Sequence, residues 1–467
     1  CQFGMASGAM GGDIASRTSY FDLVYRDIPD GGGFIVSAGL SQLIDYLRNL
    51  KFTDEDIEYL RSTQSFSEEF LDYLKNFKFT CSVWAVPEGT PVFPFEPVIT
   101  VKGPLIEAQF IEAALLMMIN YQSLIATKAS RIVRAADGRE VYEFGTKRAH
   151  EASAAVYGAR AAFIGGCNAT SDVVASKEFG IPAFSTMTHS LVQAFDSEYE
   201  AFKYYAAQFP NNCVLLVDTY STVKSGVPNA IKVFDEVLKP MGVRPKGIRI
   251  DSGDITYLSK KARRMLDEAG YADCQITVSN SVNEDIIRDM LIQGAPVDSF
   301  AVGEQLITAA SSPCLNGVYK LSAVEENGEI IPRIKISDNT GKITTPGSKT
   351  VWRLFDREVG KAIADVVTLS GEEIDQNAPY ELFDPIHTWK RKTVDNFVAR
   401  RLLQPIFVNG QCVYSSPTLP EIQNYCRSQI SSLWEEVTRF ENPHHYYVDM
   451  SEKLWNVRQE LLTKFSK

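Results

Sequence analysis

The fold of this chain is organised around residues 246–254, which read Lys-Gly-Ile-Arg-Ile-Asp-Ser-Gly-Asp. The apolar run at 247–250 predicts a short buried strand, and the four residues after it predict a polar turn. Apolar residues at helical spacing then predict a helix: Leu258, Ala262, Met265, Leu266 and Ala269. A strand, a polar turn and a helix make one unit of an α/β fold, in which ligands bind at the carboxyl ends of the strands.

The chemistry of this turn suits a charged ligand. Arg249 can bind a carboxylate or a phosphate group, while Asp251 and Asp254 can bind ribose hydroxyls or a magnesium ion. The alternative interpretation is an ordinary helix start, at which a carboxylate caps the helix and the other charges are hydrated. Composition alone leaves both interpretations open.

The same pattern of an apolar run followed by polar residues recurs along the middle of the chain. Strands are predicted at 141–144, 181–184, 214–217, 247–250, 275–278 and 299–302. Helices are predicted between them, among others at 152–164 and 191–208. Most of the strand ends are separated by roughly 25 to 35 residues, the length of one βαβ unit. The sequence therefore predicts a parallel sheet, either an open doubly wound sheet or, as we favour, an irregular α/β barrel.

Both flanks of this region are predicted to contain helices together with short β-runs and hairpins, without the regular strand-helix alternation of the middle. The N-terminal flank predicts a strand at 20–25, helices at 37–50 and within 53–77, β-runs at 79–101 and a long helical segment from 104 to about 136, whereas residues 1–20 show no clear period. The C-terminal flank predicts hairpins around Asn327-Gly328 and Asn409-Gly410, then helices at 421–439 and 451–465. We expect this β-rich tail to pack against the N-terminal segment.

The composition is that of a globular protein without a nucleic-acid partner. A chain of 467 residues, 45% hydrophobic and 22% charged, can form two domains or one barrel with large additions. The net charge of −11 argues against nucleic-acid binding, which depends on basic groups. Eight scattered cysteines without a Cys-x-x-Cys pair predict reduced thiols and a cytoplasmic location, and five histidines without a ligand pattern argue against zinc. No signal-peptide pattern opens the sequence, and the apolar run at 113–119 is too short to span a membrane.

Four predicted turns at strand ends carry candidate binding groups. Residues 144–150 place an aromatic ring beside two cations, which can stack a flat ring and pair its anionic group. Residues 165–172 combine a glycine pair with hydroxyl groups, and their backbone N–H groups can cradle an anion. Residues 186–190 contain His189, a candidate nucleophile or proton carrier. Each turn has a structural alternative, namely a hydrated helix start, a plain N-cap or a packed histidine. Their recurrence, together with 251–254, at the same end of successive strands favours a binding site.

These turns resemble those of a known family. Residues 144–150, 186–190 and 249–254, then 217–220 with 225–230, and Gly303 with 306–308, resemble nicotinate phosphoribosyltransferase. The resemblance extends from about Phe21 to the C-terminal helices and implies a type II phosphoribosyltransferase fold. In that fold an irregular α/β barrel, here 121–317, carries the active site. An α/β sandwich domain is built from both chain ends, here 1–120 and the β-hairpin region with C-terminal helices at 318–467.

The resemblance also implies an activity. The family joins nicotinate to 5-phosphoribosyl 1-pyrophosphate, giving nicotinate mononucleotide and pyrophosphate for NAD salvage, with coupled hydrolysis of ATP. It works with Mg²⁺ and as a homodimer whose active site lies at the subunit interface. In such a reaction, oxocarbenium-like charge develops on the ribose, so carboxylates near the sugar and a metal on the departing pyrophosphate lower the barrier.

The residue roles follow from the same resemblance. The resemblance implies that ATP phosphorylates His189, which is expected to act in catalysis with Arg249 and Asp251. The expected nicotinate-binding residues are Phe144, Arg148, Ser171, Thr186 and Arg249. The expected phosphoribosyl pyrophosphate-binding residues are Asp251, Ser252, Gly253, Asp254, Ser279, Asn280, Gly303 and Glu304. The metal ligands are not assigned by it.

Three positions depart from the family pattern. Cys1 stands where the family has a tyrosine that stacks on nicotinate across the dimer interface, so either the sequence is cut inside that motif or the ring contact is lost. Lys147 stands where many relatives have a second arginine, which weakens any bidentate contact. Glu304 replaces a common threonine, and a carboxylate beside a phosphate site is unfavourable unless it points away or meets magnesium.

Other functions remain open from the sequence. The nicotinamide enzyme reads its amide with an aspartate where this chain has Ser171, although Asp172 is the next residue. Cys1 and Glu304 would also suit a catalytically silent homologue that binds nucleotides, against which the retained His189 and Arg249 argue. The residues taken without the resemblance would allow an unrelated barrel enzyme that acts on a phosphorylated sugar.

Overall fold

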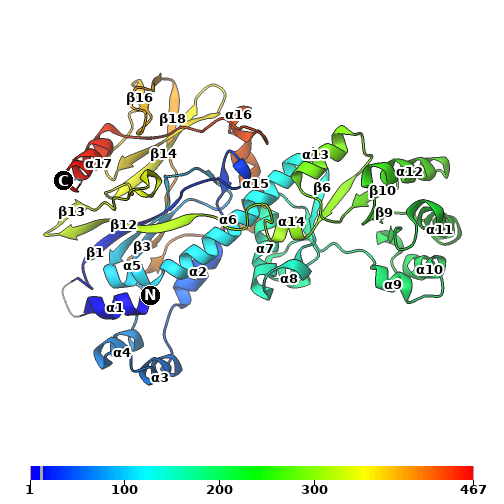
Figure 1. Cartoon of the computed structure of the whole chain (residues 1–467), viewed down its shortest axis with the longest axis horizontal. Coiled ribbons are helices and arrows are strands. Elements are labelled where there is room, and N and C mark those ends of the chain that lie inside the picture. The colour runs from blue at the N-terminus through cyan, green and yellow to red at the C-terminus, as the bar shows by residue number, and fades with distance from the viewer. Residues whose placement is uncertain (1, 11–13, 466–467) are drawn as a thin grey trace. The chain divides into compact units, whose positions relative to one another are not determined.

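The computed structural model describes residues 2–10 and 14–465, which form two compact units (Figure 1). One unit is Ile125–Pro313, and the other combines Cys1–Leu124 with Cys314–Lys467. Cys1, the position at which the family tyrosine is expected, lies outside the described residues. Within the described ranges, no helix has both the length and the apolar character needed to cross a membrane.

A six-stranded parallel sheet forms the centre of the Ile125–Pro313 unit. Its strand order is β7-β6-β11-β10-β9-β8, and every neighbouring pair is parallel. The strands are β6 (Glu140–Glu143), β7 (Ala169–Thr170), β8 (Val214–Leu216), β9 (Gly247–Ile250), β10 (Gln275–Val278) and β11 (Ser299–Val302). The sheet is a curled half-barrel with β7 and β8 at its edges, so it is more open than the predicted barrel.

Helices connect these strands in the predicted alternation. They are α7 (Ala152–Ile164), α8 (Val173–Phe179), α9 (His189–Gln193), α10 (Glu198–Gln208), α11 (Val227–Val233), α12 (Ile255–Glu268), α13 (Glu284–Ile292) and α14 (Glu304–Ile307). The strands at 247–250, 275–278 and 299–302 and the helix at 152–164 are confirmed with the predicted bounds. The apolar side chains of these strands and helices are largely buried. Their spacing along the sequence is the pattern from which the elements were predicted.

Two predictions in this unit are wrong. The strand at 181–184 does not form, because Ala183 makes only an isolated parallel bridge to Thr170 and the rest of the run is irregular. The helix at 191–208 is two helices, α9 and α10. The side chain of Ser197 accepts a hydrogen bond from the backbone N–H of Glu200 and so begins a new helix.

The second unit has a seven-stranded sheet with strands from both ends of the chain. Its order is β13-β12-β1-β5-β3-β19-β20. The strands are β1 (Thr18–Tyr25), β3 (Ser82–Ala85), β5 (Pro97–Pro104), β12 (Gly317–Glu326), β13 (Glu329–Pro332), β19 (Gln404–Val408) and β20 (Gln411–Cys412). The early strand β1 and the late strand β12 lie side by side as antiparallel neighbours (Figure 1). The predicted packing of the tail on the N-terminal segment is thus confirmed.

Both predicted hairpins turn at an Asn-Gly pair. Asn327 and Gly328 have φ of 53° and 81°, and Asn409 and Gly410 have φ of 49° and 79°. A type I′ turn needs positive φ at both central residues, which asparagine tolerates and glycine adopts freely. Local chemistry therefore set these two turns.

The helices of this unit precede, separate and follow these strands in the sequence. They are α1 (Gln2–Met10), α2 (Leu40–Asn49), α3 (Asp54–Ser62), α4 (Glu68–Lys75), α5 (Leu105–Phe110), α15 (Leu419–Ser431), α16 (Glu435–Thr438) and α17 (Glu452–Phe465), with α6 (Glu112–Ala135) running on into the other unit. Helix α1 was not predicted from the sequence, because its Gly, Ala and Ser residues hide any period. Only Ala6 of that helix is buried.

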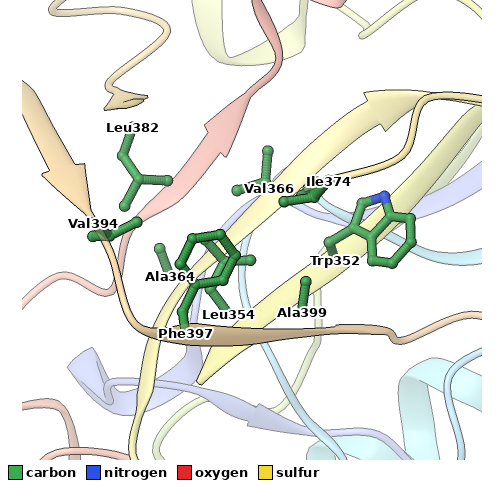
Figure 2. Close-up of a cluster of buried hydrophobic side chains, with 9 residues drawn as sticks. All are labelled: Trp352, Leu354, Ala364, Val366, Ile374, Leu382, Val394, Phe397 and Ala399. Carbon is green, nitrogen blue, oxygen red and sulfur yellow. The ribbon is translucent and has the colours of Figure 1, made fainter. Parts of the chain in front are cut away.

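A smaller sheet in the same unit, β18-β14-β15-β21, carries its own core. The strands are β14 (Lys349–Asp356), β15 (Ala362–Leu369), β18 (Phe397–Arg401) and β21 (Val448–Met450), with a β16–β17 hairpin (Tyr380–Phe383 and Arg391–Val394) nearby in sequence. Figure 2 shows the apolar cluster: Trp352, Leu354, Ala364, Val366, Ile374, Leu382, Val394, Phe397 and Ala399. Side chains alternate along a strand, so Arg353 points away from its neighbours Trp352 and Leu354. It pairs with Asp365 at 2.6 Å, both side chains being fully buried.

Candidate active site

The predicted site residues of the Ile125–Pro313 unit follow the strands of one parallel sheet. Phe144 follows β6, Ser171 follows β7, Asp251 follows β9, Ser279 follows β10 and Gly303 follows β11. Because carboxyl ends of parallel strands share one edge of a sheet, residues from five separate stretches of sequence meet there. The fold therefore assembles a site that no single stretch contains.

Arg249 is the centre of the hydrogen bonding at this edge. Its Nε donates to Ser279 Oγ at 2.8 Å, and its two terminal nitrogens donate to Thr186 Oγ1 and to Asp251 Oδ1, each at 2.9 Å. The guanidinium carbon lies 5.5 Å from the centre of the Phe144 ring. Three of its five N–H groups are thus used, and each terminal nitrogen keeps one N–H for a ligand.

Asp251 is held as a carboxylate. Burial by itself would raise its pKa, but the Arg249 guanidinium and the Ser279 hydroxyl hold the pKa of Asp251 below its ordinary value. Ser279 donates a hydrogen bond to the same oxygen that Arg249 binds. The group is therefore ionised at neutral pH.

Asp218, which follows β8, braces the turn after β9. Its Oδ2 accepts hydrogen bonds from the backbone N–H of Asp251 at 3.0 Å and from the Ser252 hydroxyl. Its Oδ1 is buried and has no hydrogen-bond partner in the described part of the chain. A buried carboxylate oxygen without a donor is a natural ligand for a cation.

His189 lies between Thr219 and Asp251. Its Nδ1 is 3.0 Å from Thr219 Oγ1, and its Nε2 is 3.6 Å from Asp251 Oδ2. The side chain is 40% exposed, so it can meet a ligand from solution. An imidazole held by a hydroxyl on one nitrogen and faced by a carboxylate on the other can carry a proton or act as a nucleophile.

The turn after β6 opens on a cavity. Arg148 Nε lies 3.8 Å from Glu304 Oε2, and both side chains are more than half exposed. They line a cavity of about 350 Å³ together with His150, Thr308, Ala310 and Pro313. The carboxylate of Glu304, the departure noted in the sequence, therefore faces a cation here.

Asp172, the neighbour of Ser171, is fully engaged in the structure. Its Oδ1 accepts the backbone N–H of Ala175 at 2.9 Å and caps α8, and its Oδ2 accepts the Thr146 hydroxyl at 3.1 Å. The residue is 5% exposed. The plain N-cap that was one interpretation of this turn is what the structure contains.

The remaining predicted residues lie at loop or helix starts. Asp254 caps α12 by accepting the Tyr257 backbone N–H at 3.0 Å, the structural role that was its alternative interpretation. Gly253 has φ of 82° and Asn280 has φ of 78°, so both turns use the left-handed region. A Cβ on Gly303 would lie 3.1 Å from the Phe144 carbonyl oxygen, so a larger residue would crowd the turn after β6.

Comparison with known proteins gives the family. The models of the nicotinate phosphoribosyltransferase N-terminal domain and C-terminal domain match residues 1–120 and 348–458. A nicotinate phosphoribosyltransferase from Bacillus subtilis is 46% identical over 461 residues, covering 98% of this chain and 93% of that protein. The chain belongs to the nicotinate phosphoribosyltransferase family.

Solved structures agree with the nicotinate phosphoribosyltransferase assignment. The crystal structure of human nicotinic acid phosphoribosyltransferase superposes with a TM-score of 0.88 at 28% identity, covering 98% of this chain and 99% of that one. A nicotinate-nucleotide pyrophosphorylase from Pyrococcus furiosus gives a TM-score of 0.70 at 25% identity, with 92% and 93% covered. The mixed α/β fold with its parallel half-barrel is thus the fold of the human nicotinate phosphoribosyltransferase.

No role was assigned from the sequence to three residues at this edge of the sheet, although residues 217–220 were among those that carry the family resemblance. Asp218 and Thr219 follow β8 just as Asp251 follows β9, so their position after a predicted strand was the available signal. Glu143 is buried beneath the turn after β6 and gave no signal, because a glutamate at the end of a strand is ordinarily exposed.

Proposed function

We infer that this enzyme joins nicotinate to 5-phosphoribosyl 1-pyrophosphate, forming nicotinate mononucleotide and pyrophosphate with coupled hydrolysis of ATP. Family membership over nearly the whole chain supports the activity. The arrangement of Arg249 supports the placement of the site: a guanidinium with two uncommitted N–H groups, beside an aromatic ring and an ionised carboxylate. The product belongs to NAD salvage.

Nicotinate is a flat ring with a carboxylate, and we place it between the Phe144 ring and Arg249. The remaining N–H groups of Arg249 can form charge-assisted bonds to the carboxylate, with Thr186 beside them and Arg148 at the open end. The Phe144 ring supplies a stacking face. Holding the pyridine nitrogen in this way provides the proximity that displacement at the anomeric carbon needs.

The engagement of Asp172 favours nicotinate over nicotinamide. Reading an amide with this residue would need an accessible carboxylate oxygen, yet Asp172 is 5% exposed and its two oxygens bind the Ala175 N–H and the Thr146 hydroxyl. Ser171, which follows β7, then occupies the specificity position and adds no negative charge. A neutral residue there avoids repulsion of the nicotinate carboxylate.

We place phosphoribosyl pyrophosphate and Mg²⁺ at the ends of β8 to β11. The buried Oδ1 of Asp218 and the Oδ2 of Asp251 are carboxylate oxygens, the ligand type that Mg²⁺ prefers. No group of three or more His, Cys, Asp or Glu side chains in the described ranges forms a metal cage, so the substrate's phosphates would complete the coordination. The ion would stabilise charge on the departing pyrophosphate. Further proposed contacts are Ser252, Gly253 and Asp254 to the ribose and pyrophosphate, and Ser279, Asn280, Gly303 and Glu304 around the 5-phosphate.

His189 is our candidate for the phosphorylated residue. When Nδ1–H donates to Thr219, Nε2 keeps its lone pair and can attack the γ-phosphorus of ATP, with ADP as the leaving group. Phosphorylation would add roughly two negative charges beside Arg249 and Asp251. That charge is sufficient to change the affinity of the site for its anionic substrates.

The assembly and domain division are also proposals. The family resemblance supports a homodimer with an interfacial active site, which light scattering of the purified chain would test. The two compact units support a barrel domain at 121–317 and a sandwich domain from 1–120 and 318–467. The cytoplasmic location stays a prediction from the cysteine pattern.

The deciding experiment measures pyrophosphate release with phosphoribosyl pyrophosphate and Mg²⁺, comparing nicotinate with nicotinamide, each with and without ATP. Release with nicotinate that ATP enhances is the expected result. Release with nicotinamide alone would reverse the specificity, and release with neither base would favour a silent nucleotide-binding homologue.

A further inference from the structure

Glu143 is a buried carboxyl group that adjoins the proposed nicotinate-binding residues in sequence. It is the last residue of β6, precedes Phe144, and is 1% exposed. Its Oε1 accepts the backbone N–H of Gly145, and its Oε2 accepts the Thr170 hydroxyl at 2.6 Å. Both acceptor oxygens are therefore used by groups that belong to two different turns.

Those two turns carry the proposed nicotinate-binding residues. Gly145 lies between Phe144 and Arg148 in the turn after β6, and Thr170 precedes Ser171 at the end of β7. The backbone also connects them, because Ser171 N–H donates to the Glu143 carbonyl oxygen at 2.9 Å. The turn after β6 has little room to move, since a Cβ on Gly145 would lie 2.4 Å from Ile307 Cβ.

We propose that Glu143 is a positioning residue that sets the nicotinate pocket by holding the turns after β6 and β7 together. This inference rests on the proposed function, because it assumes that Phe144 and Ser171 meet the base. A buried carboxyl group loses its hydration, so an apolar side chain would serve stability at least as well. Two acceptor oxygens that bind one group in the turn after β6 and one at the end of β7 hold these segments in place, which an apolar side chain cannot do.

Variants of one residue separate positioning from general stability. Glu143→Ala removes both acceptors and should raise the KM for nicotinate roughly 10- to 100-fold, the cost of a misplaced binding group. The KM for phosphoribosyl pyrophosphate should change by less than about twofold, because its proposed contacts follow other strands. Glu143→Gln should stay near wild type, since its carbonyl oxygen can accept Gly145 N–H and its amide can donate to Thr170. Glu140→Ala, an exposed carboxylate on the same strand, is the matched control.

A purely structural role would give a different kinetic pattern. Glu143→Ala would then lower the melting temperature and the active fraction while leaving the KM for nicotinate of the active fraction unchanged. That result would overturn the proposal. If Glu143→Ala does not fold, Thr170→Val removes the hydrogen bond to Glu143 Oε2, together with the bond that Thr170 Oγ1 accepts from the Asp172 backbone N–H at 3.0 Å, and is expected to raise the same KM.

Hydrogen exchange tests the geometry independently of turnover. Amide exchange in the peptide covering 144–149 should accelerate in Glu143→Ala and remain unchanged in Glu143→Gln and Glu140→Ala. Unchanged exchange in Glu143→Ala would overturn the proposal whatever the kinetics show. A wild-type enzyme that forms no nicotinate mononucleotide would instead refute the proposed function, and the exchange result would still decide whether Glu143 holds the turn.

Discussion

Arg249 has five N–H groups, of which three bind neighbouring side chains and two remain for a ligand. Three are bound by Thr186, Asp251 and Ser279, which fix the plane of the guanidinium. The other two remain available for a ligand, and the guanidinium carbon lies 5.5 Å from the centre of the Phe144 ring. A lysine could not do both, because its ammonium is a point charge without a fixed fork of donors.

Arg249→Ala should therefore act on nicotinate binding. We expect the KM for nicotinate to rise roughly 10- to 100-fold, the value of a lost hydrogen bond to a charged group, in steady-state assays at saturating phosphoribosyl pyrophosphate. Arg244→Ala is the control, because Arg244 is exposed and pairs with Asp273. An unaltered KM in Arg249→Ala would move the carboxylate contact elsewhere, with Arg148 as the next candidate.

His189→Ala should separate the ATP effect from phosphoribosyl transfer. Without an imidazole there is no acceptor for the phosphoryl group, so the ratio of rates with and without ATP should fall to about one while the ATP-free rate persists. Phosphoryl transfer from labelled ATP to the protein should vanish in the same variant. His445→Ala, an exposed histidine of the other unit, is the control. Continued ATP stimulation in His189→Ala would remove this residue from the mechanism.

Single residues also show what the sequence could not resolve. Asp254 and Asp251 lie in one turn and look alike in the sequence, yet Asp254 caps α12 whereas Asp251 meets Arg249. A carboxylate at a helix start satisfies backbone N–H groups or a ligand equally well, so residue type cannot separate the two roles. Asp251 also contacts Ser279 after β10 and Asp218 after β8, which only the fold brings near, whereas Asp254 binds the local Tyr257 N–H.

At the level of elements, predictions succeeded where the signal was local. The apolar run at 247–250 and the Asn-Gly turns carry their own chemistry, so the strand and both hairpins are confirmed. The strand at 181–184 failed because a strand needs a partner along its length, and here only Ala183 pairs, with Thr170. Pairing is non-local and cannot be read from one run of residues.

The turn after β8 is packed so closely that Gly226 should not tolerate a larger side chain. Gly226 ends the π-helical turn Thr222–Gly226, and a Cβ there would lie 1.7 Å from the carbonyl oxygen of Val217. Since backbone must shift to admit it, Gly226→Ala should destabilise the protein by about 1 to 3 kcal/mol in urea unfolding. It should also lower activity, because Asp218 follows Val217.

A matched substitution controls for the change of residue type. Gly8 lies in α1 and a Cβ there would meet nothing within 4 Å, so Gly8→Ala should leave stability unchanged or slightly raised. Equal stability of the Gly226 and Gly8 variants would show that β8 and the following turn are free to move apart.

For the whole molecule, the sequence predicted a parallel sheet flanked by two β-rich ends, and the structure contains both. What it could not predict is that the sheet stays open as a half-barrel and that strands about 300 residues apart, such as β1 and β12, pair in one sheet. Closure and long-range pairing depend on how all strands pack at once. The residues of one strand do not encode them separately.

Two buried carboxyl groups, one in each unit, should make stability depend on pH. Burial raises the pKa of Glu143 from 4.5 to about 7, and burial followed by the nearby charge of Asp384 raises the pKa of Asp449 from 3.8 to about 7. Between these values the folded protein holds a proton that the unfolded chain has lost. Each group therefore lowers stability as pH rises from its unfolded pKa to about 7.

The amide side chains introduced by Glu143→Gln and Asp449→Asn cannot ionise. Each substitution should therefore remove that residue's contribution to the decrease of stability with rising pH. Relative to wild type, both variants should gain stability between about pH 5 and about pH 8 in melting or urea measurements. Glu140→Gln, an exposed carboxyl on β6, should follow the wild-type curve. Since Glu143 and Asp449 belong to different units, the double variant should show the sum of the two changes if both units unfold together. A variant curve parallel to wild type at all pH values would mean that the carboxyl group in question is not protonated in the folded state.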